Sequence, residues 1–358
     1  MRTFPNYRAK LLERNFRLLN LLRIYIPLIF LLGVAFNTRA QDVQFSQFYQ
    51  VPTYQNPAFA GSAHSSRGTL HQRIQWPNLD ANYLTSFASF DTYSNKYKAG
   101  FGGYVLYDRQ GQTSISSTQI ALQGSYELHL SKQVAVRMGL QLGWAIQSVD
   151  YSVLTFPSQF SEDGLVNNAP QFDQNLVNFF DASSGLVLYT TNLWVGASFH
   201  HMNLPNMSFL GDYAALPMKT SFSAGYKIIM QERYHGLTVD PSKEISISPT
   251  FLYKMQGKSD QFDIGIYGKY HQFVAGIWYR GIPFKIYQDF QNNEALIFLL
   301  GMKLEKLAIT YSYDATLSTL GVANTGGSHE INLTYLFKRP KKRKKPTRRM
   351  PCPSFYVH

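Results

Sequence analysis

The sequence has a single cysteine and, after its first forty residues, no long apolar run. Cys352 has no second cysteine with which to form an internal disulfide. No apolar leader precedes it, as one would in a lipoprotein. No stretch beyond residue 40 reaches the roughly 18 consecutive apolar residues that a membrane-spanning helix needs. A disulfide-stabilised domain and a set of membrane helices are therefore both excluded.

The sequence motifs of common catalytic sites are also missing. The chain contains no G-x-S-x-G, no P-loop and no H-E-x-x-H. His200 and His201 form the only pair of adjacent histidines. We expect neighbours on a strand to face opposite ways, which prevents them from holding one metal ion together. The sequence therefore predicts a protein that is not an enzyme and that has no cofactor and no metal site.

Positive charge is concentrated at the two ends of the chain. Residues 1–40 carry seven Lys and Arg against one Glu, and residues 338–358 carry nine Lys and Arg and no acid. The formal net charge of +12 thus leaves residues 41–337 with a net charge of −3. A nucleic-acid-binding protein spreads its basic residues over a folded face, so this distribution argues against nucleic acid as a partner.

The first forty residues have the pattern of an export signal. A basic stretch to Arg23 precedes the apolar run 24–36, and the small-x-small sequence Thr38-Arg39-Ala40 follows it. An uncleaved membrane anchor is the alternative, but this apolar run is short for a membrane-spanning helix. We predict a signal peptide over residues 1–40.

Apolar and polar residues alternate through most of the remaining chain. In the last such run, four apolar residues share one strand face, opposite Glu330: Ile331, Leu333, Tyr335 and Phe337. Many runs reach the 9–11 residues of a tilted membrane strand, and aromatic residues, 15% of the chain, cluster at run ends. A soluble β-sandwich alternates too, but run length and aromatic position favour a membrane barrel. Inward acids such as Glu127 and Glu330 are expected to pair with inward Arg137 or Lys.

The runs number fourteen, an even count that places both barrel ends on the same side of the membrane. Their approximate ranges are 67–76, 82–92, 98–107, 115–129, 133–149, 179–190, 192–202, 218–230, 244–255, 260–270, 273–280, 295–304, 306–314 and 329–337. Short turns alternate with longer connections, which we predict to be outer loops: 150–178, 203–217, 281–294 and 315–328.

These observations predict an all-β protein, a transmembrane antiparallel β-barrel of about 14 strands in the bacterial outer membrane. The barrel is expected to cover residues 66–337. Two segments are expected to lie outside it, on the periplasmic side: an N-terminal lead, 41–65, and a basic C-terminal tail, 338–358. Four prolines and like charges give the tail no core of its own.

Short motifs give the chain a family resemblance that covers essentially all of residues 41–358. The first two are Gln44-Phe-Ser-Gln-Phe48 and Asn56-Pro-Ala-Phe-Ala-Gly61, and Arg73-Ile-Gln-Trp-Pro77 follows them. Near the end, Ser328-His-Glu-Ile331 opens the last strand, and Cys352-Pro-Ser-Phe355 lies in the tail. In these motifs the chain resembles the PorP/SprF family of type IX secretion system membrane proteins. Tyr356-Val-His358 extends past the terminal Phe that is usual there.

The resemblance implies a non-enzymatic outer-membrane component of the type IX secretion and gliding machinery of a Bacteroidota-type bacterium. It further implies export or surface anchoring of a secreted adhesin through that adhesin's C-terminal sorting domain. The implied partners are this domain, periplasmic type IX secretion components and outer-membrane lipid. The alternative is a passive outer-membrane porin for small solutes, because a fourteen-stranded barrel is wide enough for a channel unless it is plugged. Its inward residues leave this choice open.

Candidate partner-binding residues fall in three segments. The turn-rich motif 56–61 either orients the chain into the barrel or forms a periplasmic plug or docking element, with Asn56, Pro57, Phe59 and Gly61. The loops present aromatic residues to a partner, namely Phe172, Phe209 and Tyr213. The tail offers a stiff terminus with Cys352, Pro353 and Phe355, either for docking or, through its charges, for anionic lipid.

The terminal strand gives the first prediction. Barrel assembly machinery recognises a last strand of alternating apolar residues that ends in an aromatic, here Ile331, Leu333, Tyr335 and Phe337. We expect Phe337→Ala to lower the amount of folded, heat-modifiable barrel in isolated outer membranes. Unchanged amounts would mean that the assembly signal does not end at this residue.

Overall fold

The computed structural model describes most of the chain beyond the predicted signal peptide. The described residues are 42–111, 115–153, 160–161, 164–165, 175–209, 211–231, 234–235, 238–239, 244–287, 290–318 and 321–337. The predicted signal peptide and the basic tail lie outside them. Within the described residues, no helix is long and apolar enough to cross a membrane.

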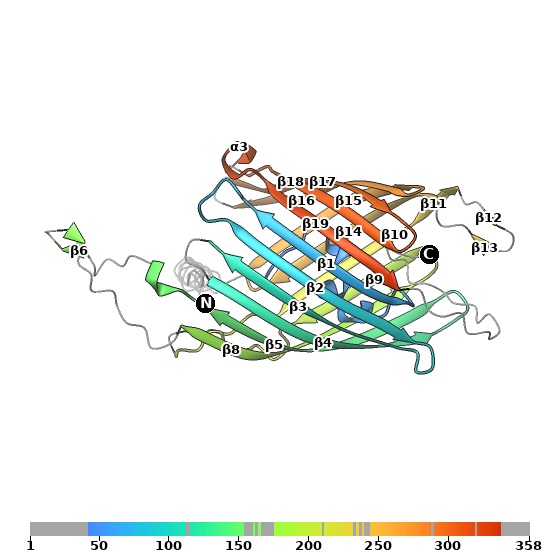
Figure 1. Ribbon diagram of the computed structural model, residues 1–358, viewed down its shortest axis with the longest axis horizontal. Coiled ribbons are helices and arrows are strands. Elements are labelled where there is room, and N and C mark those ends of the chain that lie inside the picture. Colours follow the sequence, from blue (N-terminus) through green and yellow to red (C-terminus); the bar gives the residue numbers. More distant parts are fainter. Residues whose placement is uncertain are drawn as a thin grey trace, which may run out of the picture. The chain divides into compact units, whose positions relative to one another are not determined.

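One large antiparallel sheet forms the body of the protein (Figure 1). Its strands are β1 (Ser66–Gln75), β2 (Tyr83–Ser94), β3 (Ala99–Gln110), β4 (Ile115–His129), β5 (Ala135–Ser148), β8 (Leu176–Tyr189), β9 (Leu193–His200), β10 (Lys219–Tyr226), β11 (Ile228–Gln231), β14 (Ile245–Gln256), β15 (Ser259–Tyr270), β16 (Phe273–Tyr287), β17 (Phe290–Lys303), β18 (Leu307–Thr316) and β19 (Ser328–Phe337). Two short hairpins stand apart from it: β6 (Phe160–Ser161) with β7 (Gly164–Leu165), and β12 (Tyr234–His235) with β13 (Thr238–Val239).

The sheet closes on itself. β1 pairs with β19 along its whole length, from Ser66 opposite Phe337 to Gln75 opposite Ser328. β10 pairs with both β9 and β14, and β11 continues the pairing with β14 after a break at Lys227. β10 and β11 thus act as one strand, and the barrel has fourteen. The predicted antiparallel fourteen-stranded barrel is confirmed, and every predicted run coincides with a strand.

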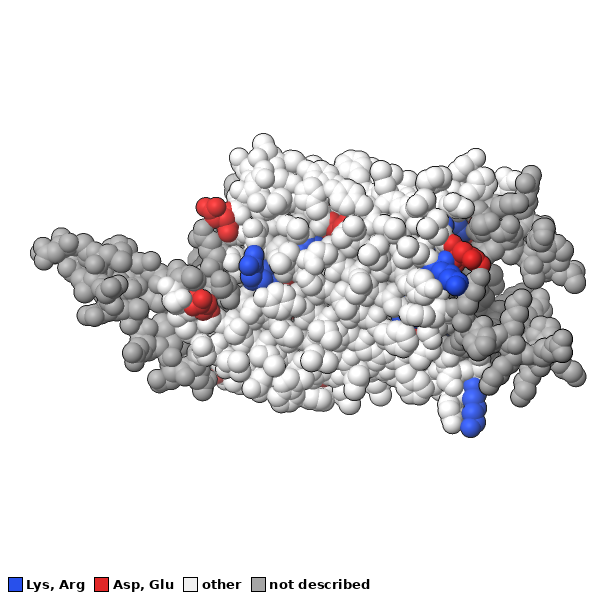
Figure 2. All heavy atoms as spheres, viewed as in Figure 1, with Lys and Arg blue, Asp and Glu red and all other residues white. Residues whose placement is uncertain are grey.

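The barrel wall is apolar outside and polar inside. On β5, Leu140 and Leu142 are 68% and 58% exposed, whereas Arg137 and Gln141, which point inward, are buried. The same alternation holds on β19, where the four predicted outward residues are exposed and Glu330 is 1% exposed. In Figure 2 most of the visible charged residues lie toward the two ends of the barrel and leave an uncharged belt between them. A soluble protein has the opposite pattern, with polar residues outside. A barrel surrounded by hydrocarbon needs an apolar outer face.

The two open ends of the barrel differ. We call the end with Ser66 and Phe337 the terminal mouth, and the opposite end the loop mouth. The loop mouth carries the connections 149–175, 201–218 and 317–327, the last of which contains α3 (Gly321–Thr325), and η3 (Tyr151–Val153) follows β5 there. Connections at the terminal mouth are short apart from 232–244.

The predicted outer loop 281–294 is wrong, because most of it is strand. β16 runs on to Tyr287 and β17 already begins at Phe290. The stretch contains Pro283, and proline cannot donate to a β-ladder. The structure keeps the ladder by shifting register at two places, and Gly281 adopts φ +144° at the first. β-Bulges of this kind accommodate such residues within a continuing strand.

Residues 42–65 lie inside the barrel, so the expectation that this lead lies outside it is wrong. We call residues 42–65 the lumen segment. It contains three short helical turns: η1 (Phe48–Gln50), α2 (Pro52–Gln55) and η2 (Pro57–Phe59). All but a few of its residues are buried, and the wall residues that bury them are the inward-facing ones. A plug was one alternative for the motif 56–61, but the strand pattern could not place the whole segment, because the barrel interior forms only when strands distant in sequence close the ring.

The lipid-facing surface gives a second prediction. Leu140→Lys places a charge in the middle of an outward face, so we expect it to destabilise the folded barrel by about 2–4 kcal/mol. Leu130→Lys is the matched control, because Leu130 is 60% exposed but lies in the turn at the terminal mouth. Urea unfolding in lipid vesicles measures both. Equal effects at the two positions would contradict the assignment of this face to hydrocarbon.

Candidate functional site

The lumen segment runs the length of the barrel from one mouth to the other. Its first described residue, Asp42, meets Lys219 and Gln256, which lie at the loop-mouth ends of β10 and β14. Its last residue, Ser65, donates through its hydroxyl to the carbonyl of Phe337 at the terminal mouth (2.6 Å). The segment therefore crosses the lumen once before β1 begins.

The Gln44–Phe48 motif is bound to the seam where the first and last strands meet. The backbone N–H groups of Ser46 and Gln47 donate to the two carboxylate oxygens of Glu330, at 2.7 and 2.9 Å. The amide of Gln47 donates to Ser312 (3.0 Å) and accepts from Thr310 (2.7 Å). Hydrogen bonds between backbone N–H groups and a buried carboxylate are among the stronger ones in proteins.

A single hydroxyl connects this motif to three buried charges. Ser46 Oγ donates to Asp314 and accepts from Arg73 (2.7 Å) and Arg280 (2.9 Å). Arg73 also pairs with Glu330 and with Asp314. Buried ion pairs are costly unless their remaining donors and acceptors are satisfied. Here the lumen segment provides some of the hydrogen-bond partners that these buried charges need.

The Asn56–Gly61 motif lies flat against the inner wall. The side-chain amide of Asn56 donates to the carbonyls of Leu186 and Ala197, at 3.2 and 2.9 Å. Its side-chain oxygen accepts from the N–H of Ala58, two residues further along the chain, at 2.8 Å. The side-chain oxygen thereby caps η2, in which Pro57 takes the first position. One asparagine thus starts the turn and fastens it to β8 and β9.

Glycines in the wall allow this close approach. A Cβ at Gly139 would lie 2.3 Å from Ala58 N, and one at Gly185 would lie 2.0 Å from Asn56 Oδ1. Gly61 has φ +71°, and its own Cβ would come 2.7 Å from Gly100. The wall therefore has no side chain at the points where the lumen segment comes closest to it.

Two buried arginines hold the backbone of the same motif. Arg137 donates to the carbonyls of Ala58 (3.0 Å) and Ala60 (2.5 Å) and pairs with Glu127 (2.6 Å). The predicted pairing of Glu127 with Arg137 is confirmed. On the other side, Arg67 pairs with Asp91 at 2.8 Å, and Asp91 also accepts from the N–H of Gly61 at 2.7 Å. Guanidinium groups suit this role because they carry several donors in a fixed plane.

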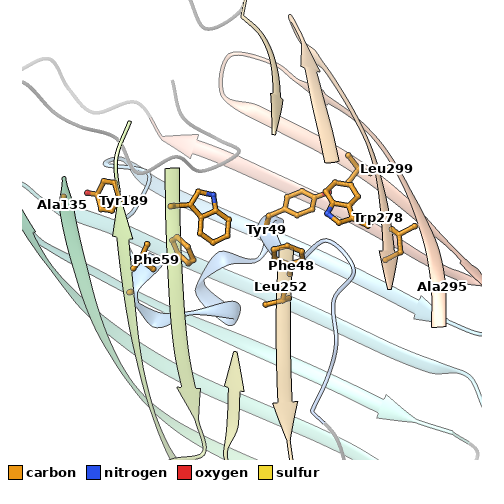
Figure 3. Close-up of a cluster of buried hydrophobic side chains, with 13 residues drawn as sticks. Phe48, Tyr49, Phe59, Ala135, Tyr189, Leu252, Trp278, Ala295 and Leu299 are labelled. Atoms are coloured by element: carbon orange, nitrogen blue, oxygen red, sulfur yellow. The ribbon is translucent and has the colours of Figure 1, made fainter. Parts of the chain in front are cut away.

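Aromatic contacts complete the filling of the lumen (Figure 3). Tyr49 stacks on Trp278 of β16, with ring centroids 5.0 Å apart, and Phe59 meets Trp194 of β9 edge-on at 5.8 Å. In Figure 3, Phe48 and Tyr49 lie next to Trp278 and Leu252, and Phe59 faces the opposite part of the wall. A second cluster surrounds Phe45 and includes Val51, Tyr54, Phe87, Tyr104, Leu106 and Ala121.

The start of the lumen segment is held by charge. Asp42 pairs with Lys219 (2.5 Å) and with His201 (2.8 Å), and His201 also pairs with Asp181 (2.8 Å). Burial acts to lower the pKa of His201, but the two carboxylates outweigh it and raise this pKa to about 9. Burial acts to raise the pKa of Asp42, yet His201 and Lys219 hold it well below its usual value. The imidazole is therefore charged at neutral pH.

The expectation that His200 and His201 face opposite sides of a strand is wrong. β9 ends at His200, and His201 has φ +58°, so the chain turns there. Both side chains are buried. Among the described residues, no group of three or more His, Cys, Asp or Glu is placed to hold a metal ion.

The structure places the predicted partner-binding residues in three different settings. Asn56, Pro57, Phe59 and Gly61 are buried in the lumen, where their contacts are with the barrel itself. In the loop 201–218, Phe209 is half-buried and Tyr213 is 75% exposed. The others lie outside the described residues: Phe172, Cys352, Pro353 and Phe355.

Sequence reasoning missed the wall residues that bind the lumen segment. Arg67 and Arg73 on β1, Asp91 on β2 and Asp314 on β18 all point inward and are buried. A signal was present, since each occupies a polar position of an alternating strand. What the pattern does not show is which of these charges face one another across the lumen.

Comparison with known proteins places the chain in a family. The family described as "Type IX secretion system membrane protein PorP/SprF" matches residues 37–335. The chain belongs to the PorP/SprF family. Its matched range covers both the lumen segment and nearly the whole barrel, so this PorP/SprF protein is an outer-membrane barrel of type IX secretion. That family is a secretion family and not a known enzyme family.

Solved structures similar to this PorP/SprF protein are outer-membrane proteins. The outer membrane protein Omp33 of Acinetobacter baumannii has 8% sequence identity and a TM-score of 0.42, with 77% of this chain and 100% of that chain covered. A FadL homologue of Pseudomonas aeruginosa has 11% identity and a TM-score of 0.40, with 80% and 94% covered. No curated protein matches the chain in sequence.

The fit between the lumen segment and the wall gives a third prediction. Gly139→Val adds a side chain where Ala58 already lies. We therefore expect it to displace the lumen segment from the wall and to destabilise the folded barrel by about 1–3 kcal/mol. Gly124→Val is the matched control, because a Cβ at Gly124 meets nothing within 4 Å. In planar bilayers, we expect low conductance from the wild-type and control barrels and raised conductance from Gly139→Val. A large, steady conductance from the wild type would instead support a passive porin.

Proposed function

We propose that this PorP/SprF barrel is a closed, non-enzymatic anchoring component that supports export or surface attachment of a secreted adhesin. The adhesin is held through its C-terminal sorting domain, and periplasmic secretion components bind on the other side. The observation that carries the proposal is the filled lumen. Residues 42–65 are fixed to the wall by buried hydrogen bonds, ion pairs and aromatic contacts along the whole barrel.

The filled lumen argues against the porin alternative. A solute path would need the lumen segment to leave, which would strand the buried carboxylate of Glu330 without its two N–H donors. It would also remove carbonyl acceptors from the buried guanidinium of Arg137. Leaving such groups unsatisfied costs about 1–3 kcal/mol each, and more for charged groups. A barrel closed in this way works through its mouths and outer surface.

The loop mouth offers a surface on which a partner can bind. The connection 201–218 is held in place by the side chain of Asn203, which donates to the carbonyl of Phe180 (2.7 Å) and accepts from the N–H of Ala182 (3.0 Å). Beyond this anchor, Tyr213 is 75% exposed. A rigidly supported loop with an exposed aromatic residue is a common form of protein-binding surface. We place the adhesin at this mouth, outside the cell, and the periplasmic partner at the terminal mouth, near the tail.

An adhesin-display experiment tests the proposal. We expect Tyr213→Ala to weaken capture of the sorting domain by about tenfold or more, as loss of an aromatic anchor does. Tyr97→Ala is the matched control, because Tyr97 is 60% exposed but lies in the turn between β2 and β3 at the terminal mouth. Co-purification with the adhesin, and adhesin on intact cells, measure the effect. Normal display by a strain that lacks the whole barrel would refute the function.

A further inference from the structure

A polar cavity of about 460 Å³ opens beside the lumen segment at the loop mouth. It lies under the ends of β1, β3 and β18 and the beginnings of β2 and β19, since Gln75, Gln110, Thr316, Tyr83 and Ser328 all line it. Asp42 and its neighbours in the lumen segment form its inner side. Its volume falls within the range of ligand pockets.

The third family-like motif, Arg73-Ile-Gln-Trp-Pro77, forms one side of this cavity. Arg73, Gln75 and Trp76 line it, while Ile74, the intervening residue, is 39% exposed on the outer surface. Trp76 has φ +57°, a strained conformation for a bulky residue, and its N–H donates to the carbonyl of Gly327 at 2.9 Å. This turn brings the indole edge-on to the Tyr83 ring, with centroids 5.7 Å apart.

Among the residues that line the cavity, the acids Asp42, Asp108, Glu294 and Asp314 outnumber the arginines Arg73 and Arg280. Arg73 is already paired with Glu330 and Asp314, and Arg280 with Asp263 and Asp314.

Three acids keep unused capacity at the cavity. Asp108 is 3% exposed, and the partners from which it accepts among the described residues are Thr85 (2.6 Å) and Gln110 (2.8 Å), which are both neutral. Glu294 forms no salt bridge among the described residues. Asp314 is 2% exposed, and its Oδ1 has no hydrogen-bond partner in the part of the chain that the structure describes.

We propose that this cavity binds a guanidinium or ammonium group, carried by a basic side chain of a peptide that enters from the loop mouth. Asp108 and Glu294, which line the cavity, are the acceptors, and the buried carboxylate of Asp314 lies beside them. Trp76 and Tyr83 offer aromatic faces near the entrance, which favour cations through cation–π attraction. The added charge offsets the excess of buried carboxylates, so the site is selective for a cation over a neutral group of the same shape.

A basic side chain fits this site better than a metal ion does. A metal site needs several ligands converging within about 2.6 Å of one point, and no such group of three acids or histidines is present among the described residues. The cavity is instead lined by separate acids, Asp108 and Glu294, together with the aromatic residues Trp76 and Tyr83. The inference adds a recognition element to the proposed function and rests on it only for the source of the peptide.

Calorimetry with short peptides tests the site on the purified full-length mature barrel in detergent. The probe is acetyl-Gly-Arg-Gly-amide, and its neutral isostere acetyl-Gly-citrulline-Gly-amide is the matched ligand. We expect saturable binding of the arginine peptide that is at least about tenfold tighter than that of the citrulline peptide. Added salt should weaken only the arginine peptide.

Isosteric variants locate the binding. Glu294→Gln and Asp108→Asn should each weaken the arginine peptide by about tenfold or more. Glu305→Gln, at an exposed carboxylate in the terminal-mouth turn between β17 and β18, should leave it unchanged. Heat-modifiability on gels confirms that each variant is folded.

Three outcomes would overturn the inference: equal affinity for both peptides, no saturable binding of the arginine peptide, or its displacement by calcium at low concentration. The calorimetry contains no secretion component. A negative result therefore rejects the cation site alone, and the adhesin-display experiment still tests the proposed function.

Discussion

The ion pair between Arg73 and Glu330 connects the first strand, the last strand and the lumen segment, and the rest of the structure depends on it. Arg73 lies on the first strand and Glu330 opposite it on the last, so the pair spans the seam that closes the barrel. The same carboxylate accepts the N–H groups of Ser46 and Gln47 from the lumen segment. Closure of the ring and seating of the segment therefore share one buried charge. An outer face that meets hydrocarbon forces polar residues inward, and those residues need such partners.

A fourteen-stranded ring is too wide for its inward side chains to fill by themselves. The chain solves this with its own N-terminal residues. Where the segment comes closest to the wall, the wall has glycine, as at Gly139 and Gly185. Where the segment exposes carbonyls, the wall has arginine, as at Arg67 and Arg137. The family motifs therefore describe the two sides of one internal interface. A barrel built in this way is suited to holding partners at its mouths, and the residues that face them lie at strand ends and in loops.

The loop mouth combines several of these features within a small region. Asp42 is held there by His201 and Lys219, so the start of the lumen segment has a fixed position beside the cavity. The Arg73–Pro77 motif contacts both the lumen segment and the cavity. Its arginine donates to Ser46 of the lumen segment, and its tryptophan lines the cavity. The cavity and the lumen segment are thus connected through Arg73, which lines the cavity and donates to Ser46.

The sequence by itself determined the barrel, its fourteen strands and the outward face of the last strand, because alternation of apolar and polar residues with period two is a local property of the sequence. It also supplied the motifs that identify the family. It did not determine that 42–65 lies inside, nor that the Gly281–Pro283 stretch continues a strand through a bulge. Only the closed ring brings Ser46 to Glu330, 284 residues away in sequence, and Asn56 to Leu186 and Ala197. Such pairs depend on the register and closure of distant strands, which no local pattern contains.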